Sequence, residues 1–343
     1  MNKFAVIGII GLIVAVVVIA AGAYWLLKDH PEYVLSHIEN NSESSALYVA
    51  KNGDIMIAYQ DDRKQPLAST VKIILAMEYA EQVGSNNLDP NERVSLMELE
   101  KYYFSGTDGG AHPAWLDSIE GEPTLHEVVK GMITYSSNAN TDYLIEKLGR
   151  DSIQDRIATL SDHEPFLPIV GSMLVPIVED GVELMNRDEY REAAWRIHDE
   201  ITSEARVAEG DLSMPEQRLW SDHLTSSTAR TYGELVAQLN RGNWSGEAEE
   251  VLRDVLEWPM QVNEGNAEWL KHLGMKGGST AFVLNQAMYA DRLDGEQYEL
   301  VILLDDLGPI EQFKLQRNMN SFFVKMLADS QFLEDAVIRF NES

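Results

Sequence analysis

Apolar residues follow two different spacings along this chain, and the expected structure changes where the spacing changes. Residues 46–60 hold two short apolar runs separated by Asn52 and Gly53, a pair typical of a two-residue β-hairpin turn. Directly after Ser69 the apolar positions recur at helical spacing, so this serine lies at the expected start of a helix. A shorter amphipathic helix is predicted before the hairpin, over residues 31–40.

The strand pattern disappears in the middle of the chain and returns near its end. Residues 90–245 are predicted to be mostly helical, because apolar positions recur there every three or four residues. Strands are expected within residues 274–292 and again over 297–307, on either side of an Asp294–Gly295 turn. The apolar positions in residues 310–330 predict an amphipathic helix near the end of the chain.

This order of elements predicts one domain that begins in a sheet, leaves it for a helical lobe and returns to it. We expect the domain over residues 31–340, with an antiparallel sheet flanked by helices and a helical lobe inserted at about residues 69–245. The fold class is therefore α/β plus all-α. A cleft between the sheet and the lobe is a natural place for a site.

The first 27 residues have the composition of a membrane helix. Residues 4–27 contain no charged side chain, and as a helix they would reach about 36 Å, enough to cross a hydrocarbon core. Tyr24 and Trp25 stand at the end of the run, where aromatic rings favour the membrane interface. A cleavable signal peptide is the alternative, because residues 20–23 are small. The longer apolar run favours an uncleaved anchor, with residues 1–3 as a short cytoplasmic tail. The domain is then expected on the extracytoplasmic side of the cell membrane.

Charge and cysteine content exclude several classes of function. The 343 residues include 56 acidic and 27 basic side chains, a formal net charge of −29, which disfavours nucleic acid as a partner. The absence of cysteine excludes a catalytic thiol and thiolate zinc sites. The eight histidines show no metal-binding pattern, so neither a metal nor a cofactor is expected.

Three short motifs occur in order on suitable elements. Ser69 and Lys72 form Ser-x-x-Lys at the start of a helix, and Ser136 and Asn138 form Ser-x-Asn at a polar break between helices. Lys276 opens Lys-Gly-Gly on the first returning strand. From about residue 31 to 340 the chain resembles the class A β-lactamase-like, penicillin-recognising serine hydrolases. The element order and the distances between the motifs fit that family.

The resemblance implies a role for each motif residue. Lys72 lies one helical turn from Ser69, so it can serve as the base that activates this nucleophile. Ser136 would pass the proton to the leaving nitrogen, Lys276 would hold a substrate carboxylate, and Asn138 would hold Lys72 and a substrate amide.

The oxyanion hole is also implied by the resemblance. It would consist of the backbone N–H groups of Ser69 and Ser279. Gly277 and Gly278 replace the more usual Thr/Ser-Gly of the family, and Gly278 would let a ligand approach the strand closely. The loop of residues 102–117 adds Tyr103, His112 and Trp115 as further candidates for substrate contact.

The deacylating glutamate of class A β-lactamases has only a partial counterpart. Glu164 and Pro165 begin a Glu-Pro-x-Leu pattern, but Pro168 stands where the family has asparagine, and Glu164 comes about eight residues early. Glu164 is thus either the deacylating base or an ordinary loop carboxylate.

The expected function depends on whether Glu164 is a working deacylating base. With a working base the protein would hydrolyse β-lactam amide bonds, which is the expectation carried by the resemblance. Without it the protein would react with penicillins and release them slowly, as a DD-peptidase does, or act as an esterase on another acyl substrate. A cell-wall binding module that kept the fold is the non-enzymatic alternative.

Overall fold

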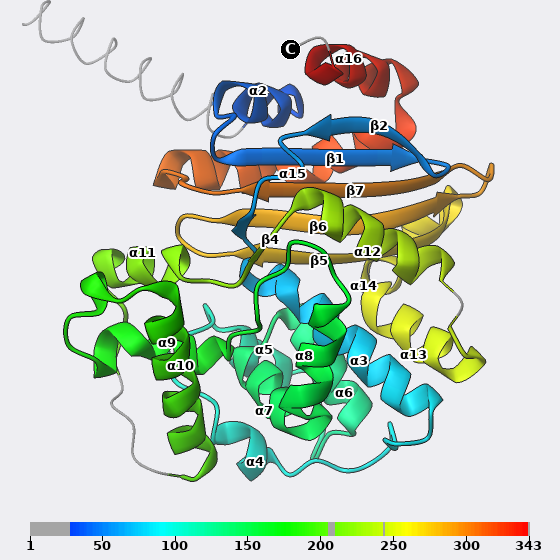
Figure 1. Ribbon diagram of the computed structural model, residues 1–343. Coiled ribbons are helices and arrows are strands. Elements are labelled where there is room, and N and C mark those ends of the chain that lie inside the picture. Colours follow the sequence, from blue (N-terminus) through cyan, green and yellow to red (C-terminus); the bar gives the residue numbers. More distant parts are fainter. Residues whose placement is uncertain (1–27, 205–209, 243, 342–343) are drawn as a thin grey trace, which may run out of the picture.

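The computed structural model describes residues 28–204, 210–242 and 244–341, which build a five-stranded antiparallel sheet and a helical lobe beside it (Figure 1). The strand order is β2-β1-β7-β6-β5, so β5 lies at the edge nearest the lobe. The hairpin predicted at Asn52 and Gly53 is present as the β1–β2 pair. The strands are β1 (Ser45–Lys51), β2 (Asp54–Tyr59), β5 (Leu270–Ser279), β6 (Leu284–Arg292) and β7 (Gln297–Leu304).

Both faces of the sheet are buried, and β1 shows how its sequence achieves this. Leu47 and Val49 point to one face and pack against the terminal helices, while Ala46 and Tyr48 point to the other. The first face is covered by α2 (Glu32–Asn40), α15 (Pro309–Ala328) and α16 (Ser330–Asn341), and the second by α12 (Ala229–Arg241). Helix α16 was not predicted, although it buries four apolar side chains: Phe332, Leu333, Ala336 and Phe340.

The helical lobe is built around α3, whose side chains are buried along almost its whole length. Two-residue strands, β3 (Gln65–Pro66) and β4 (Ser226–Ser227), pair where the chain enters and leaves the lobe. The α-helices on this side are α3 (Lys72–Gly84), α4 (Leu96–Glu100), α5 (Ala111–Leu116), α6 (Leu125–Lys130), α7 (Asn138–Leu148), α8 (Arg150–Ala158), α9 (Ile169–Val178), α10 (Arg187–Thr202), α11 (Met214–Asp222), α13 (Gly246–Leu256) and α14 (Trp258–Val262). Short helical turns are η1 (Ala68–Val71), η2 (Gly131–Tyr135), η3 (Val182–Leu184) and η4 (Glu264–Glu268).

A membrane-spanning helix is not found in residues 28–204, 210–242 and 244–341, where every helix is too short or too polar. The predicted anchor, residues 4–27, lies outside the described residues. The anchor therefore stays a prediction.

Candidate active site

Ser69 lies in the short turn η1, between β3 and α3. The turn begins at Ala68, whose φ of 46° lies in the left-handed region that non-glycine residues seldom adopt. The backbone before it is held by a hydrogen bond from the Leu67 N–H to the Thr225 carbonyl at 2.9 Å. Strained backbone of this kind clusters at functional sites. The side chain of Ser69 is half-buried and lines the cavity described below.

Lys72 is the first residue of α3 and its side chain is fully buried. Its Nζ donates to the Ser136 carbonyl at 2.7 Å and to Asn138 Oδ1 at 2.8 Å, and it lies 3.2 Å from Ser136 Oγ. Burial, and then the nearby positive charge of Lys276, hold the pKa of Lys72 well below its usual range. A lysine in this state can accept a proton at neutral pH.

Ser136 bridges the two lysines of the site. It follows the π-turn η2 in the left-handed conformation, with a φ of 68°. Its Oγ lies 3.2 Å from Lys72 Nζ and 3.1 Å from Lys276 Nζ, which also donates to the Gly277 carbonyl at 2.9 Å. Burial lowers the pKa of Lys276 to about 7. The three groups form a continuous path along which a proton can move.

Strand β5 approaches η1 so closely that Gly278 has no room for a side chain. A Cβ on Gly278 would lie 2.6 Å from both the Leu67 carbonyl oxygen and the Thr70 nitrogen. The glycine thus allows the backbone of β5 to lie against the turn that carries Ser69. Ser279 is the next residue on this strand and lines the same cavity. The oxyanion hole formed by the Ser69 and Ser279 N–H groups stays a prediction.

These residues open onto a cavity of about 740 Å³ between the sheet and the lobe. The structure brings six of the predicted residues to its wall: Ser69, Ser136, Asn138, Lys276, Gly278 and Ser279. Another wall is apolar and includes Ile169, Met173 and Ile177 of α9, with Trp220 of α11 and Leu224. Lys276 is the basic residue among the described lining residues, and the carboxylates are Asp108 and Asp211.

Glu164 is not among the described residues of the cavity wall. Its carboxylate pairs with Arg187 Nη2 at 2.6 Å and accepts the Ser226 N–H at 3.1 Å. Its own N–H donates to the Ser226 carbonyl at 2.9 Å, so β4 and α10 hold it away from the cluster. The predicted role of Glu164 as the deacylating base stays a prediction, and its position gives that role no support.

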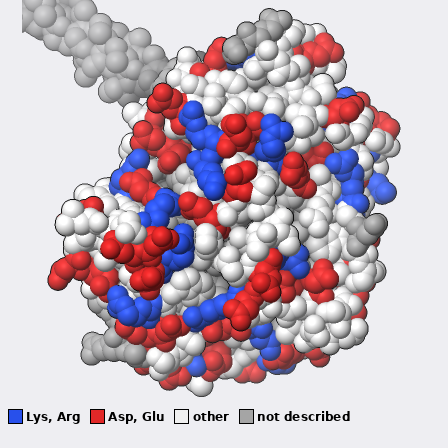
Figure 2. Space-filling model, viewed as in Figure 1, with Lys and Arg blue, Asp and Glu red and all other residues white. Residues whose placement is uncertain are grey.

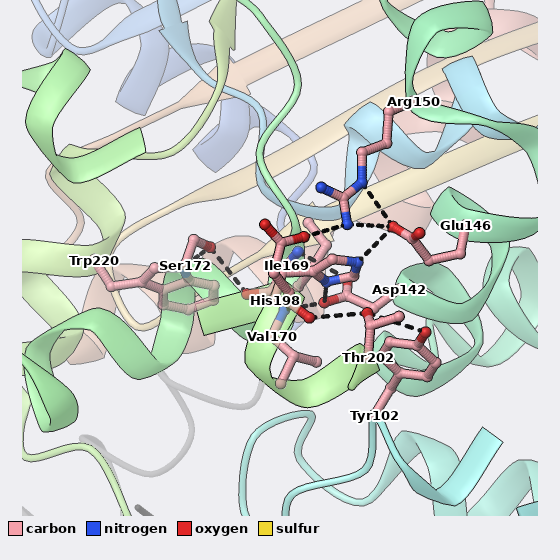
Figure 3. A network of polar contacts seen from close by, with 11 residues as sticks. Tyr102, Asp142, Glu146, Arg150, Ile169, Val170, Ser172, His198, Thr202 and Trp220 are labelled. Atoms are coloured by element: carbon pink, nitrogen blue, oxygen red, sulfur yellow. Dashed lines mark hydrogen bonds and ion pairs between the residues drawn. The ribbon is translucent and has the colours of Figure 1, made fainter. Parts of the chain in front are cut away.

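The first turn of α9 lines the cavity through Ile169, and a buried carboxylate holds this turn in place. Asp142 of α7 is fully buried, and its two oxygens accept the Ile169 N–H at 2.8 Å and the Val170 N–H at 3.0 Å (Figure 3). A carboxylate at a helix N-terminus is favourable because it meets unpaired N–H groups and the positive end of the helix dipole. Asp142 therefore fixes the helix that presents Ile169 to the cavity.

A chain of charged groups continues from Asp142 through His198 and Glu146 to Arg150 (Figure 3). His198 of α10 places Nδ1 3.3 Å from Asp142 Oδ2 and Nε2 3.0 Å from Glu146 Oε1, which also pairs with Arg150 at 2.7 Å. Burial alone would lower the pKa of His198, but the two carboxylates outweigh it and raise the pKa to about 9. Sequence analysis missed this network. The available signal was that Asp142 follows Asn138 by one helical turn, on the same face of α7.

The segment of residues 102–117 includes α5, and none of its three predicted contact residues, Tyr103, His112 and Trp115, is among the described lining residues of the cavity. His112 and Trp115 are buried. His112 Nδ1 instead contacts Ser137 Oγ at 2.9 Å, which supports the Ser136 turn from behind. Thr107 lines the cavity, and its carbonyl accepts Asn138 Nδ2 at 3.0 Å. Within the described ranges, no cluster of three or more His, Asp or Glu side chains could hold a metal.

A family model described as the β-lactamase enzyme family matches residues 34–263, more than half of the chain. The chain belongs to this family. The β-lactamase of Sphaerobacter thermophilus DSM 20745 has the same fold, with a TM-score of 0.56 at 20% identity over 86% of this chain and 97% of that chain. A class A β-lactamase representative from Bacteroides cellulosilyticus DSM 14838 matches with a TM-score of 0.53 at 12% identity, over 86% of this chain and 100% of that chain.

The protein PBP-A also shares the β-lactamase fold. Its TM-score is 0.51 at 15% identity, over 85% of this chain and 95% of that chain. At such identities these structures show the fold alone. Among curated proteins, none matches this chain in sequence.

Proposed function

We propose that this member of the β-lactamase family is a serine enzyme that β-lactams and related acyl amides acylate on Ser69, and that releases the acyl group slowly. The observation that carries the proposal is the contact chain from Lys72 through Ser136 to Lys276, which ends in the cavity that Ser69 lines. A buried lysine that can lose its proton can act as the base for a nearby serine. Without such a role, burying a charged group only costs free energy of folding.

Acylation follows from this arrangement. Neutral Lys72 accepts the hydroxyl proton of Ser69 while Oγ attacks the substrate carbonyl carbon. The backbone N–H groups of Ser69 and Ser279 stabilise the oxyanion. Each donor of that kind typically lowers the activation free energy by about 3 kcal/mol. When the carbon–nitrogen bond breaks, Ser136 gives its proton to the leaving nitrogen and recovers one from Lys72. The acyl group then remains on Ser69 as an ester.

Slow release is proposed because the α9 side of the cavity is apolar. Ile169 and Met173 cannot activate a water, and Glu164 is engaged with Arg187. This favours penicillin-binding, DD-peptidase-like behaviour over rapid β-lactam hydrolysis. Hydrolysis is the second candidate, because Asp108 and Asp211 also line the cavity. Both oxygens of Asp108 already accept backbone N–H groups at the start of α5, which hold this carboxylate in place.

The test is intact-mass spectrometry of the full chain, in a mild detergent, after mixing with benzylpenicillin. Ser69→Ala is the control, because it removes the acceptor oxygen and leaves the rest of the site in place. We expect an adduct on the wild type that persists for many minutes and no adduct on the variant.

Two other outcomes contradict the proposal in different ways. An adduct that disappears while the drug is consumed shows rapid hydrolysis, and Asp108 and Asp211 then become the residues to substitute. No adduct with penicillin or with a general serine probe shows that the protein is not an acyl-transfer enzyme and favours the binding module.

We also propose that residues 4–27 anchor the protein in the cell membrane with the domain outside. The uncharged run of 24 residues supports this, and so does the basic tail before it. Protease added to intact cells is expected to digest the domain, and cytosolic protection of the domain would contradict the proposal. Carbonate extraction distinguishes an anchored chain from a released one.

A further inference from the structure

One face of α15 is exposed along the length of the helix and carries large apolar side chains. Exposed residues recur at Ile310, Phe313, Arg317, Asn320 and Val324, a spacing that places them in one stripe. The three apolar members, Ile310, Phe313 and Val324, are 62%, 47% and 44% exposed. The opposite face of the helix packs against the sheet. Several exposed apolar side chains on one face indicate a contact surface.

The charge of α15 is opposite to that of the whole chain. The chain has a formal net charge of −29, whereas α15 carries Lys314, Arg317 and Lys325 against a single acidic residue, Glu311. Glu311 Oε2 accepts the Gly308 N–H at 2.8 Å, so this carboxylate caps the start of its own helix. The exposed stripe holds Arg317 and no carboxylate. It therefore lacks the acidic groups that would repel an anionic surface.

The first described residues of the chain lie against this same helix. The His30 N–H donates to Asn318 Oδ1 at 2.5 Å, and the Ser321 hydroxyl donates to Asp29 Oδ1 at 2.5 Å. Ser321 is partly exposed and directly follows Asn320 of the stripe. The chain therefore joins the domain at the exposed flank of α15, near the middle of the helix.

This attachment limits the distance between α15 and the proposed anchor. The uncharged run ends at Leu27, and the two residues from there to Asp29 span at most about 7 Å. The headgroup layer on each side of the hydrocarbon core is roughly 5–8 Å thick. If residues 4–27 cross the membrane, the middle of α15 is thus at the level of the lipid headgroups.

We propose that the exposed stripe of α15 docks on the lipid headgroups of the membrane that holds the anchor. The inference rests on the proposed anchor and adds a second contact between the domain and the membrane. Ile310, Phe313 and Val324 enter the boundary between headgroups and acyl chains, as the apolar face of an interfacial helix does. Arg317 lies at the level of the lipid phosphates and is attracted to them. The domain is thereby held in one orientation.

This orientation brings one end of the active-site cavity near the membrane. Gln312 in the first turns of α15 donates through Nε2 to the Thr280 carbonyl at 3.0 Å, and Thr280 lines the cavity. The docked helix is therefore in direct contact with the turn between β5 and β6 at the cavity wall.

The absence of cysteine allows single positions to be labelled on the full chain. Phe313→Cys and Val324→Cys each receive a fluorophore, and the chain is reconstituted in nanodiscs of phosphatidylcholine and phosphatidylglycerol. Lipids with a nitroxide on the headgroup serve as the quencher. Both labels are expected to be quenched about threefold or more relative to a label at Met97→Cys. Met97 is the matched control, because it is 76% exposed and lies on α4, at the end of the molecule opposite α2 (Figure 1).

A further substitution distinguishes contact from mere proximity to the anchor. Phe313→Asp added to Val324→Cys places a carboxylate in the stripe, and quenching of the label at position 324 is expected to fall by about half or more, because a charge is costly to bury. Met97→Asp makes a charge change at the other end of the molecule and is expected to leave this quenching unchanged. Thermal unfolding of each variant checks that it is folded.

The possible contradictory results have different meanings. If the chain enters the nanodiscs but the labels on α15 are quenched no more than the label at position 97, the docking is wrong and the anchor stands. Equal quenching with and without Phe313→Asp also overturns the docking, because the anchor alone then explains the proximity. Cross-linking between copies at position 313 without quenching would show that the stripe binds a second copy of the chain. If the chain does not enter the nanodiscs, the anchor and the docking both fail.

Discussion

At the scale of single residues, the site depends on how far burial lowers the pKa of two lysines. Lys72 and Lys276 are both buried, and the positive charge of Lys276 raises the cost of charging Lys72. Because burial is the main cause for both, the low pKa values depend on the closed packing around them. The two lysines can be tested separately, because only Lys72 is expected to accept a proton from Ser69.

Lys72→Arg is expected to slow acylation by about 10²–10⁴-fold, the range typical of losing a general base. Arginine keeps the positive charge but does not deprotonate in proteins, so it cannot accept the proton of Ser69. Stopped-flow acylation by a chromogenic β-lactam measures the rate, and thermal unfolding checks that the variant is folded. A folded variant within threefold of the wild-type rate would exclude Lys72 as the base.

The low pKa of Lys276 predicts that acylation by carboxylate-bearing substrates becomes slower at alkaline pH. Its pKa of about 7 means that it is charged below pH 7 and loses the charge above, so the second-order rate constant should fall as pH rises through 7. Lys276→Arg should remove this limb, since arginine stays charged. The pH profile of acylation measures both. If the rate constant of the variant still falls at alkaline pH, the fall is caused by the titration of another group.

At the scale of elements, the contact between β5 and η1 connects the sheet to the nucleophile. Gly278→Ala is expected to destabilise the fold by about 1–3 kcal/mol and to slow acylation, because the new Cβ would lie 2.6 Å from backbone atoms of η1. Urea unfolding and the acylation rate measure the two effects. Gly277→Ala is the matched control for stability, since its Cβ would lie 3.0 Å from the flexible end of Gln286 and no closer than 3.5 Å to backbone, at the Asn285 carbonyl. Equal losses in both variants would contradict this account.

The connection between α7, α9 and α10 through His198 should make stability depend on pH. The folded pKa of His198, about 9, lies above its ordinary value of 6.5. Its contribution, roughly 3 kcal/mol, is therefore complete below about pH 6.5 and is lost as pH rises through 9. The free energy of unfolding of His198→Asn should differ from the wild type at pH 6 and approach it at pH 9.5. A difference that does not change between these pH values would show that His198 is not charged in the fold.

Elements with local signals could be predicted from sequence, and contacts between distant segments could not. The β1–β2 hairpin and the start of α3 follow from neighbouring residues, and so does the position of Ser69 directly before that helix. Glu164 was placed by a local motif, but its real surroundings depend on Ser226, which is far away in sequence. Asp142 was overlooked because its partners, the N–H groups that begin α9, become visible only when α7 and α9 meet.

At the scale of the whole molecule, the net charge dominates the surface. Acidic side chains are spread over the face shown in Figure 2, with basic side chains among them, and many basic groups form ion pairs such as Arg218–Asp306 and Arg292–Asp294. Exposed pairs of this kind contribute about 0–1 kcal/mol each. Even if every basic group were paired, the formal charge of −29 would remain as unpaired carboxylates.

Salt is therefore expected to stabilise the protein at pH 7. Raising NaCl from 0.1 to 1 M shortens the screening length from about 10 to 3 Å, which weakens the repulsion among carboxylates more than it weakens the shorter ion pairs. The melting temperature of the full chain in a non-ionic detergent should rise by about 2–5 °C, measured by scanning fluorimetry. Near the isoelectric point, at about pH 4.5, the net charge vanishes and the same addition of salt should have little effect. A melting temperature that falls with salt at pH 7 would show that the ion pairs outweigh the repulsion, and that the acidic surface is organised to stabilise the fold.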